Sequence, residues 1–300
     1  MEKKQYTKLE HYVPQCYLKN FSILENDNYF AYCLFKNSTI IKRININNVC
    51  AVNDLYELES LEGYVDRNDI EDGFIDMESK YADFCREHLS QIDYCQTIVL
   101  SSTNLELIKE FCAFLFYRSK YMIDLLIKFC EIYIKHNPAN WSNIRKEIKS
   151  VDSKTLESEI IPYLDKCFSY ELAYRLIKNM LNTRDLSIEV MALKKTFGSN
   201  YCFLYSENND FITSDTPVVS IHGTKAKCLG FKSLICVPLT TNCCIAFLDN
   251  KKYNGQIISL TPKQVDDVNL AQVSKDYGLL ISKEEKWIDR YFSNKKALGS

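Results

Sequence analysis

The glycines of this chain are few and stand apart from one another, which limits the tight loops that it can build. Only 8 of 300 residues are glycine, whereas an average usage of roughly 7% would give about 21. They occupy positions 63, 73, 198, 223, 230, 255, 278 and 299. A phosphate-binding loop needs glycines a few residues apart, because backbone N–H groups must come close to the ligand. The sequence therefore excludes the glycine-rich loops of dinucleotide-binding proteins, Walker-type nucleotide-binding proteins and kinases, and the G-x-S-x-G nucleophile loop. An anion site here would rely on side chains or helix N-termini.

The charge balance argues against a broad electrostatic surface for nucleic acid. The net charge is −2 and the isoelectric point is near 6.2, whereas nucleic-acid-binding domains usually carry a basic face. The charge balance still allows a local groove that binds a nucleotide or nucleic-acid substrate. Only eight residues are arginine, and arginine alone presents a planar two-pronged donor, so each arginine is informative.

Signals for export and for a membrane are missing from the sequence. Residues 1–15 hold no apolar leader segment, and charged residues repeatedly interrupt the most apolar stretch, 105–134, whereas a membrane span needs about 20 apolar residues. The thirteen cysteines are odd in number and form no C-x-x-C pair. We expect a cytoplasmic protein with no membrane partner, whose cysteines in apolar runs are buried free thiols: Cys112, Cys130, Cys202 and Cys236.

Hydrophobic spacing predicts strands toward both ends of the chain and helices between them. Residues 29–35 and 39–45 are rich in β-branched and aromatic side chains and predict a β-hairpin. Helical spacing predicts helices over 68–89 and 101–136, the second behind a Ser-Ser-Thr-Asn cap signal, and about three shorter helical segments over 141–197. The pattern then changes to short strands, at 201–205, 210–213, 218–221, 233–237 and 243–248, followed by a helix from Pro262 and a strand at 278–281.

These elements predict an α+β fold with an N-terminal β-hairpin arm, a mostly helical middle, and a C-terminal antiparallel or mixed β-sheet with a terminal helix. No repeat, low-complexity block or flexible linker divides the chain. We therefore expect one integrated domain over residues 1–300, in which the two β-rich segments can join in one sheet. Its parts would be the arm and hairpin at 11–66, the helical middle at 68–197, and the β-rich segment with the terminal helix at 200–292.

Arg118 stands out because it falls on an apolar helix face. In a single helix over 101–136, the charged residues share one face, which we expect to be exposed: Lys109, Glu110, Lys120, Asp124, Lys128 and Glu131. Arg118 lies in the middle of the opposite arc, among residues such as Leu125, Phe129 and Tyr133. A buried arginine is unfavourable unless a carboxylate and further acceptors replace its water. The sequence therefore predicts a carboxylate that faces Arg118.

Glu71 and Glu78 are the candidates for this carboxylate. Both fall inside the apolar face of the helix predicted over 68–89, seven residues and about 10 Å apart along its axis. One interpretation is a structural ion pair that locks two helices together. In the other, Glu71, Glu78 and Arg118 line a water-filled pocket, where the arginine binds an anionic group and a carboxylate acts as a base or a metal ligand.

Two loop motifs add further candidates. His11 and Gln15 lie on a stiff arm around Pro14, where His11 could either make one structural hydrogen bond or bind and react with a ligand. Ser214 and Asp215 precede Pro217 between two short strands, an arrangement typical of an ordinary turn but also able to direct Asp215 into a site. The four histidines show no zinc-ligand spacing, and the many aromatic residues fall mostly at core positions.

Several of these motifs occur together in a known pattern. They are HYVPQ at 11–15, YLKNF at 17–21, DLY at 54–56, the helix that carries Glu71 and Glu78, Arg118, FITSDTPVV at 211–219, PLT at 238–240, and Asn269. Together they resemble a bacterial domain family of unknown function, marked by an N-terminal HxVPQ-x-YLKNF segment and a C-terminal FITSDxPVV segment.

This resemblance extends over roughly residues 11–285 and implies one integrated domain but no known activity. It implies that eight polar residues occupy recurrent positions: His11, Gln15, Glu71, Glu78, Arg118, Ser214, Asp215 and Asn269. Cys16 departs from the pattern, because an aromatic or aliphatic residue is expected there. Helix-face analysis and the resemblance thus select overlapping residues.

Two hypotheses of function follow. The first is a hydrolase that acts on a phosphodiester or nucleotide, with His11 as acid or base, Asp215 and Glu78 as orienting groups or ligands of a divalent metal ion, and Arg118 as an anion clamp. Gln15 and Asn269 would position the substrate, and Glu71 and Ser214 would complete the ligand site. The second is a non-enzymatic binding or defence- or toxin-associated interaction module, in which the buried polar network only fixes the fold. A shared active site requires that His11, Glu78, Arg118 and Asp215 converge.

Overall fold

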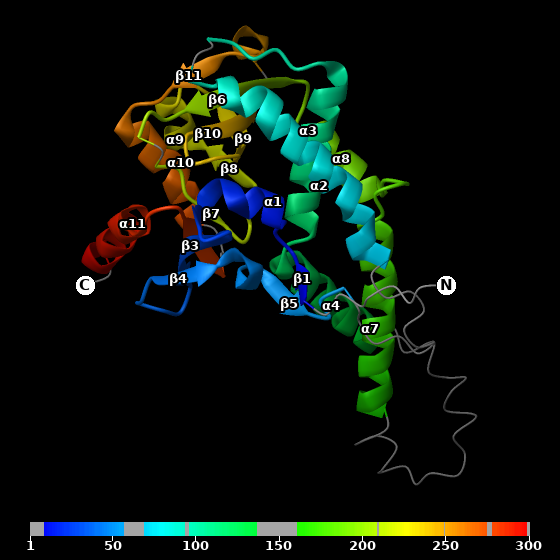
Figure 1. The fold of residues 1–300 in the computed structure, drawn as a ribbon. Coiled ribbons are helices and arrows are strands. Elements are labelled where there is room, and N and C mark those ends of the chain that lie inside the picture. The colour runs from blue at the N-terminus through cyan, green and yellow to red at the C-terminus, as the bar shows by residue number, and fades with distance from the viewer. Residues whose placement is uncertain are drawn as a thin grey trace, which may run out of the picture.

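The computed structural model describes residues 9–56, 69–93, 96–136, 161–208, 210–248, 250–274 and 278–298. Strands from both β-rich segments and a helical layer between them form the α+β fold that the sequence predicts (Figure 1). Residues 57–66 of the predicted arm segment, and the part of the predicted helical middle between 141 and 160, lie outside the described residues.

The N-terminal arm begins with β1 (Leu9–His11) and continues after Pro14 into the short helix α1 (Gln15–Leu18). The predicted hairpin is confirmed as β3 (Asn28–Phe35) and β4 (Lys42–Asn45), and β2 (Ile23–Glu25) also pairs with β3. Returning toward the arm, β5 (Ala51–Asn53) pairs antiparallel with β1, with His11 opposite Ala51. This pairing fixes the backbone of the residues around His11.

A second sheet carries most of the C-terminal strands, in the order β11-β6-β10-β9-β8. Its neighbouring strands run antiparallel except for the parallel pair of β11 and β6. The bounds are β6 (Asn200–Tyr205), β8 (Val219–His222), β9 (Ser233–Pro238), β10 (Cys243–Leu248) and β11 (Ile257–Ser259). All six residues of β10 are buried, because α9 (Gly223–Cys228) and α10 (Pro262–Ser274) pack over one face and the helical middle over the other.

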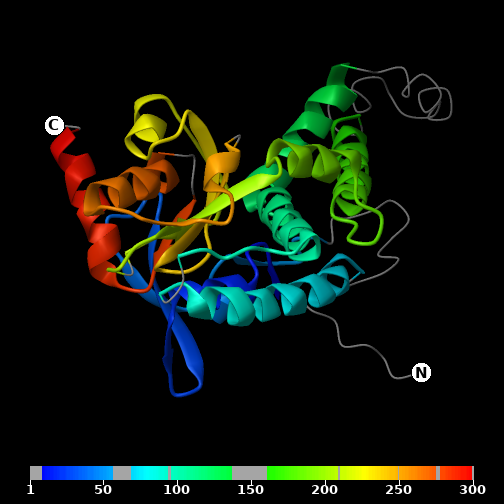
Figure 2. The same ribbon diagram turned by 90° about the horizontal axis from the view of Figure 1, so that it is seen from above.

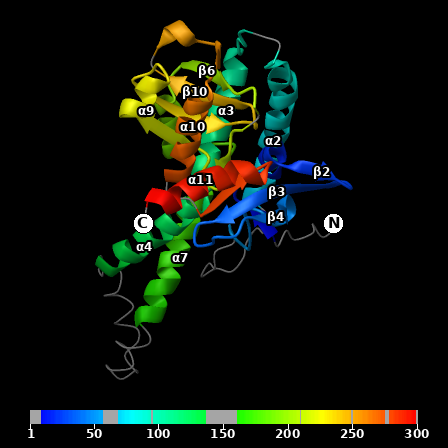
Figure 3. The same cartoon turned by 90° about the vertical axis from the view of Figure 1, so that its left-hand side faces the viewer.

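One strand near the C-terminus joins the two β-rich segments. β12 (Leu279–Ser282) pairs with β3 of the hairpin on one side and with β7 (Thr213–Ser214) on the other. The following helix α11 (Glu285–Leu298), which lies beyond the helices predicted from the sequence, packs on β3 and β12 (Figure 3). Strands from the two β-rich segments therefore share one sheet, in the order β2-β3-β12-β7 with β4 beside β3.

The helical middle starts with α2 (Asp69–His88), close to its predicted bounds. The prediction of one helix over 101–136 is wrong, because the chain forms α3 (Ser102–Tyr117) and α4 (Lys120–His136). Ser101 caps α3 as predicted, by accepting a hydrogen bond from Asn104 N. At the break, Ser119 Oγ accepts a hydrogen bond from Met122 N, as a helix N-cap does. The apolar spacing continues across this break, and it therefore hides the end of α3.

Four side chains differ from their predicted exposure, one on α3 and three on α4. Lys109 is 6% exposed, although its predicted place is the solvent face, and its Nζ bonds Glu106 at 3.0 Å. Leu125, Phe129 and Tyr133 of α4 are predicted to be core residues but are 46, 57 and 47% exposed. Because α4 departs from the axis of α3, it packs against α7 (Ile161–Met180) through a different face. Figure 2 shows these green helices on the opposite side of the molecule from the red C-terminal helix.

Two further expectations can be compared with the described residues. The cysteines expected to be buried thiols, Cys112, Cys130, Cys202 and Cys236, are buried and unpaired. Among the described helices, none combines the length and the apolar character needed to cross a membrane. The helical middle ends with α8 (Ile188–Thr196), whose N-cap is Ser187.

Candidate functional site

Arg118 lies at the C-terminal end of α3 and is the largest fully buried side chain of the described residues, with 1% exposure. Its Nη1 donates to Glu78 Oε1 at 2.8 Å, and its Nη2 donates to Glu71 Oε2 at 3.3 Å and to the His11 carbonyl at 2.6 Å. Its Nε donates to the Tyr56 hydroxyl at 3.1 Å. The prediction that a carboxylate faces Arg118 is confirmed, and both predicted glutamates supply one.

This group, which we call the Arg118 cluster, consists of His11, Tyr56, Glu71, Glu78 and Arg118. The two glutamates come from one face of α2, and the Phe74 ring between them lies 3.8 Å from the guanidinium carbon. The glutamate side chains are 22% and 28% exposed, so solvent reaches the carboxylate side of the cluster but not the arginine. Burial raises the pKa of the Glu71 carboxyl, although the charge of Arg118 opposes this effect.

His11 presents its imidazole at the edge of the cluster. Gln15, four residues further along the arm and the first residue of α1, places its Nε2 3.3 Å from His11 Nε2. Burial lowers the pKa of His11, the Arg118 charge lowers it further, and hydrogen bonds to the backbone of Ile46 and Asn47 together with the charge of Glu78 oppose these effects. A neutral imidazole and a carboxyl with a raised pKa thus flank the same arginine.

Buried contacts of the arm hold His11 and Gln15 in place. Tyr17 is fully buried, its hydroxyl donates to the Pro238 carbonyl at 2.6 Å, and it lies 2.7 Å from Thr213 Oγ1. The arm is therefore tied to the C-terminal strands as well as to α2 and α3. Cys16, beside the cluster, has a pKa raised by burial to about 12, so its thiol stays protonated.

The sequence pattern gave no reason to include Tyr56 or Glu10 among the candidates. The Tyr56 hydroxyl donates to the His11 carbonyl at 3.3 Å while it accepts from Arg118, and Tyr56 N donates to Glu10 Oε2 at 2.7 Å. Glu10 is 1% exposed. Tyr56 belongs to the DLY motif, which only the family resemblance singled out, and the three-residue strand before it is too short for a periodic signal.

Ser214 and Asn269 lie in another network. Asn269 is fully buried, accepts from Ile212 N, and donates to the Asp210 carbonyl and to the Tyr291 hydroxyl. Ser214 Oγ donates to Gln272 Oε1 at 2.8 Å. These bonds join β7 to α10 and α11, and neither side chain contacts the Arg118 cluster.

Asp215 is bound close to Gly278. Both carboxylate oxygens accept from Gly278 N at 3.0 Å, and Asp215 is 8% exposed. Burial raises the pKa of Tyr12 and of Cys50, and the Asp215 charge adds to this effect at both groups. Of the four residues required to converge, the structure brings His11, Glu78 and Arg118 together, whereas Asp215 has separate partners.

Replacing Gly278 by alanine should test this close approach. A Cβ at residue 278 would lie 2.6 Å from Asp215 Oδ2, a distance that forces atoms apart. We expect the free energy of unfolding, measured in denaturant, to fall by about 1–3 kcal/mol. In an Asp215→Ala background the same glycine replacement should have little effect, and an equal loss in both backgrounds would contradict the predicted clash.

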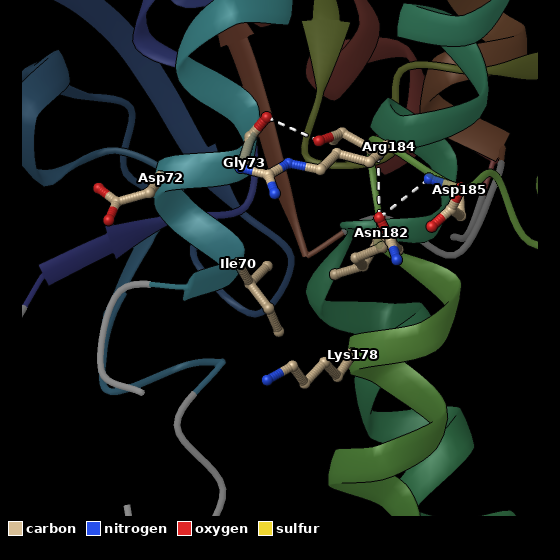
Figure 4. A pocket seen from close by; sticks show the side chains of 9 residues that line it. Ile70, Asp72, Gly73, Lys178, Asn182, Arg184 and Asp185 are labelled. Carbon is tan, nitrogen blue, oxygen red and sulfur yellow. Dashed lines mark hydrogen bonds between the residues drawn. The ribbon is translucent and has the colours of Figure 1, made fainter. Parts of the chain in front are cut away.

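The described residues include no group of three His, Cys, Asp or Glu side chains that could hold a metal ion. Two pockets lie against α2, and none of the eight residues predicted from the sequence lines either of them (Figure 4). The Arg118 cluster is therefore a partly exposed group of titratable side chains at the junction of the arm, α2 and α3. Two of its groups have pKa values moved in opposite directions, with that of His11 lowered and that of Glu71 raised.

Fold and cluster together define an α+β protein whose N-terminal arm is anchored on a buried arginine with two carboxylates. The chain belongs to the family described as a protein of unknown function, DUF4238, which matches residues 10–286. No curated protein and no solved structure matches the chain. This agrees with the resemblance to a family of unknown function that the sequence motifs indicate. The family description assigns no activity.

Protonation of His11 should make stability depend on pH. The folded-state pKa of His11 lies below the 6.5 of an ordinary imidazole, so the unfolded chain binds the proton more tightly. His11 therefore contributes its full stability above pH 6.5 and loses it as the pH falls through and below that value. Denaturant unfolding near pH 7.5 and 5.5 should show a larger loss for the wild type than for His11→Gln. The exposed His222→Gln control should behave like the wild type, and equal losses in all three proteins would contradict the prediction.

Proposed function

We propose that the Arg118 cluster is the acid–base site of a hydrolase. The convergence of His11, Glu71 and Glu78 around one arginine carries this proposal. Paired titratable groups whose pKa values are moved in opposite directions are typical of acid–base catalysis. Five of the eight candidates, which come from three separate segments of the sequence, share this neighbourhood, with Gln15 next to His11.

In this proposal the active form of the cluster is the one in which His11 is neutral and Glu71 has taken up a proton. His11 takes a proton from the attacking water, and Glu71 gives one to the leaving oxygen. The water oxygen forms a new bond to the reacting centre as the bond to the leaving oxygen breaks. Glu78 holds the charge of Arg118, and Gln15 orients the imidazole. Ser214, Asp215 and Asn269 take no step, because their bonds serve the packing of β7, β12 and α10.

The role of Arg118 differs from the anion clamp of the sequence hypothesis. Four of its five N–H groups donate to protein acceptors, and two carboxylates balance its charge. Arg118 thus acts as a positioning residue that fixes Glu71, Glu78 and the His11 backbone. A phosphodiester or nucleotide remains the proposed substrate class on sequence grounds.

The test is hydrolysis by the whole purified chain of bis(p-nitrophenyl) phosphate and of nucleoside mono- and triphosphates. Each is assayed with added Mg²⁺ or Mn²⁺ and after removal of metal with EDTA, so that a metal requirement is visible. The proposal expects turnover of at least one substrate that survives an added purification step. Absence of turnover under every condition would contradict a phosphodiester or nucleotide hydrolase.

The second candidate, an interaction module, is favoured by the exposed face of α4. Five large apolar side chains on this helix are about half exposed: Tyr121, Leu125, Phe129, Ile132 and Tyr133. Contiguous exposed apolar surface of this kind is typical of protein contact sites. The charges beside it alternate in sign along the helix, at Lys120, Asp124, Lys128, Glu131 and Lys135. An antiparallel second copy of the chain can therefore pair opposite charges while it covers the apolar face.

Under this second candidate the protein should be a dimer at concentrations of tens of micromolar. Phe129→Glu places a charge in the centre of the proposed contact and should shift the molecule to a monomer, as measured by sedimentation or light scattering. Ile188→Glu, on the exposed side of α8, is the matched control and should stay dimeric. A monomeric wild type at these concentrations would contradict the proposal.

A further inference from the structure

Positive charge is concentrated in one stretch of this chain. Residues 222–263 contain six lysines and a single acidic residue, Asp249, although the whole chain has a net charge of −2. We call this group the lysine surface, and its members are Lys225, Lys227, Lys232, Lys251, Lys252 and Lys263. The net charge of the chain thus hides a local excess of cations, which the other segments balance with an excess of acids.

The five-stranded sheet brings most of these lysines to one of its ends. The antiparallel registers place the ends of β8 and β10 beside the beginnings of β9 and β6. Two connections at this end of the sheet carry five of the lysines: Lys225 and Lys227 in α9, Lys232 before β9, and Lys251 with Lys252 in the short helical turn after β10. These lysines are therefore grouped in space as well as in sequence.

Contacts between the two connections hold them next to each other. Phe231 N donates to the Ala226 carbonyl at 2.9 Å, which folds the chain back after α9. The ring centroids of Phe231 and Tyr253 lie 5.2 Å apart. Lys232 follows the first of these rings and Lys252 precedes the second, so the two lysines belong to segments that are in contact.

The start of α10 joins the same region. Gln264 Nε2 donates to the Cys228 carbonyl at 2.9 Å, so the first turn of α10, which carries Lys263, lies beside the end of α9. In Figure 1, α9, α10 and β11 lie together in the upper left of the view, whereas β4 of the other sheet lies below them. The lysine surface thus covers one end of the C-terminal sheet and the helices next to it.

The positive charges of this surface are open to solvent. Lys225 is half-buried, and the other five lysines are exposed. Within the ranges that the structure describes, none of the six pairs with a carboxylate, and Lys252 Nζ lies 5.5 Å from the centroid of the Tyr253 ring. Asp266 of α10 instead bonds side chains of α11. The charge therefore remains available to an anionic partner.

The make-up of the surface favours a hydrated polyanion as that partner. All its charged groups are lysines, because no arginine lies between Arg184 and Arg290. Lysine binds a phosphate as a point charge and lacks the planar two-pronged donor that reads guanine. Among the described residues 200–298, no large apolar side chain is exposed, whereas protein contact sites and membrane-binding helices usually carry such side chains.

We propose that the lysine surface binds the phosphate backbone of a nucleic acid without reading its sequence. A nucleic acid presents closely spaced negative charges and a shell of condensed counterions, and each lysine that contacts a phosphate releases counterions from that shell. The surface is local, which agrees with the small net charge of the whole chain. None of its residues belongs to the Arg118 cluster, and the binding does not depend on the proposed hydrolysis.

Fluorescence anisotropy of a labelled DNA duplex of mixed sequence, titrated with the full chain, tests the proposal. We expect saturable binding that weakens as salt is added, with a slope of log association constant against log salt of about −0.9 for each phosphate contacted. The double variant Lys232→Gln, Lys252→Gln should weaken binding by about tenfold or more at low salt and reduce the slope by about two.

The double variant Lys42→Gln, Lys283→Gln is the matched control, because it removes the same charge from exposed lysines on β4 and after β12. It should bind as the wild type does, and so should Glu71→Gln in the proposed hydrolytic site. A second duplex of unrelated sequence should bind with an affinity within about threefold of the first, since lysine–phosphate contacts carry no sequence information.

Three results would overturn the proposal. The first is that the duplex does not bind, or binds with no dependence on salt. The second is that the control double variant weakens binding as much as Lys232→Gln, Lys252→Gln does, because the contact would then not lie at this surface. The third is that polyglutamate, or vesicles of phosphatidylserine and phosphatidylcholine, bind the chain more tightly than the duplex does, which would indicate an acidic protein or a membrane as the partner.

Discussion

Replacing Arg118 by leucine is expected to lower the free energy of unfolding by about 3 kcal/mol or more. Leucine fills part of the space but removes four hydrogen bonds, and it leaves the His11 carbonyl and the Tyr56 hydroxyl short of a buried partner. Glu71 and Glu78 would face each other without the cation that joins them. Because these carboxylates are a quarter exposed, solvent relieves part of this repulsion, and the estimate stays at the low end for a broken buried pair.

Denaturant unfolding measures this loss, with Arg86→Leu as the matched control. Arg86 is exposed on α2, and its ion-pair partner among the described residues is the exposed Asp83, so its replacement should change stability by no more than about 0.5 kcal/mol. The loss for Arg118→Lys should lie between those for Arg118→Leu and Arg86→Leu, since lysine keeps the positive charge but not the planar two-pronged donor of arginine. A loss below about 1 kcal/mol for Arg118→Leu would contradict the structural role given to the cluster.

Replacing Glu71 by glutamine is expected to reduce the hydrolysis rate by about 100-fold or more, the usual contribution of a positioned acid or base. Glutamine keeps the size and can still accept from Arg118 Nη2, but it cannot supply a proton. His11→Gln should cause a loss of similar size, because the amide cannot take up the proton that a neutral imidazole accepts.

Asp83→Asn provides the control on the same helix, because Asp83 is half exposed and, within the described ranges, its side chain bonds Arg86 outside the Arg118 cluster. Rates of all variants are compared at a pH where unfolding experiments show each to be fully folded. If Glu71→Gln and His11→Gln keep wild-type rates, the cluster is structural, and an observed hydrolysis would have to come from another site. If the rates of the two variants fall only in proportion to the fraction of folded protein, the cluster is likewise structural.

Sequence reasoning located the Arg118 cluster because a buried charge makes a strong physical demand. Arg118 needed a carboxylate, and Glu71 and Glu78 were the acidic residues on a predicted apolar helix face. The arginine's place at a helix end did not weaken the inference, because the partner requirement depends on burial and not on the helix length. Tyr56 and the His11 carbonyl could not be predicted, since Tyr56 follows the three-residue strand β5 and His11 ends the three-residue strand β1, and strands this short give no periodic signal.

The same reasoning could not separate Ser214 and Asn269 from the cluster. A polar residue in an apolar segment indicates that a partner exists, but not which partner. Asn269 is satisfied by Asp210, Ile212 and Tyr291, an arrangement that requires the position of α10 relative to β7 and α11. The exposed face of α4 was wrongly predicted to be part of the core for a related reason. The chain leaves α3 after Tyr117 and Ser119 caps the start of α4, but the apolar spacing continues across this break.

Titrating His11 and Glu71 by NMR in the folded wild-type protein tests the proposed acid–base cluster most directly. The structure predicts a His11 pKa below the ordinary value of an imidazole, and a Glu71 pKa above the ordinary value of a carboxyl. In Glu78→Gln, the His11 pKa should fall further, because the Glu78 charge opposes its lowering. Ordinary pKa values for both groups, or a His11 pKa that is raised, would contradict a neutral base beside a proton-holding acid.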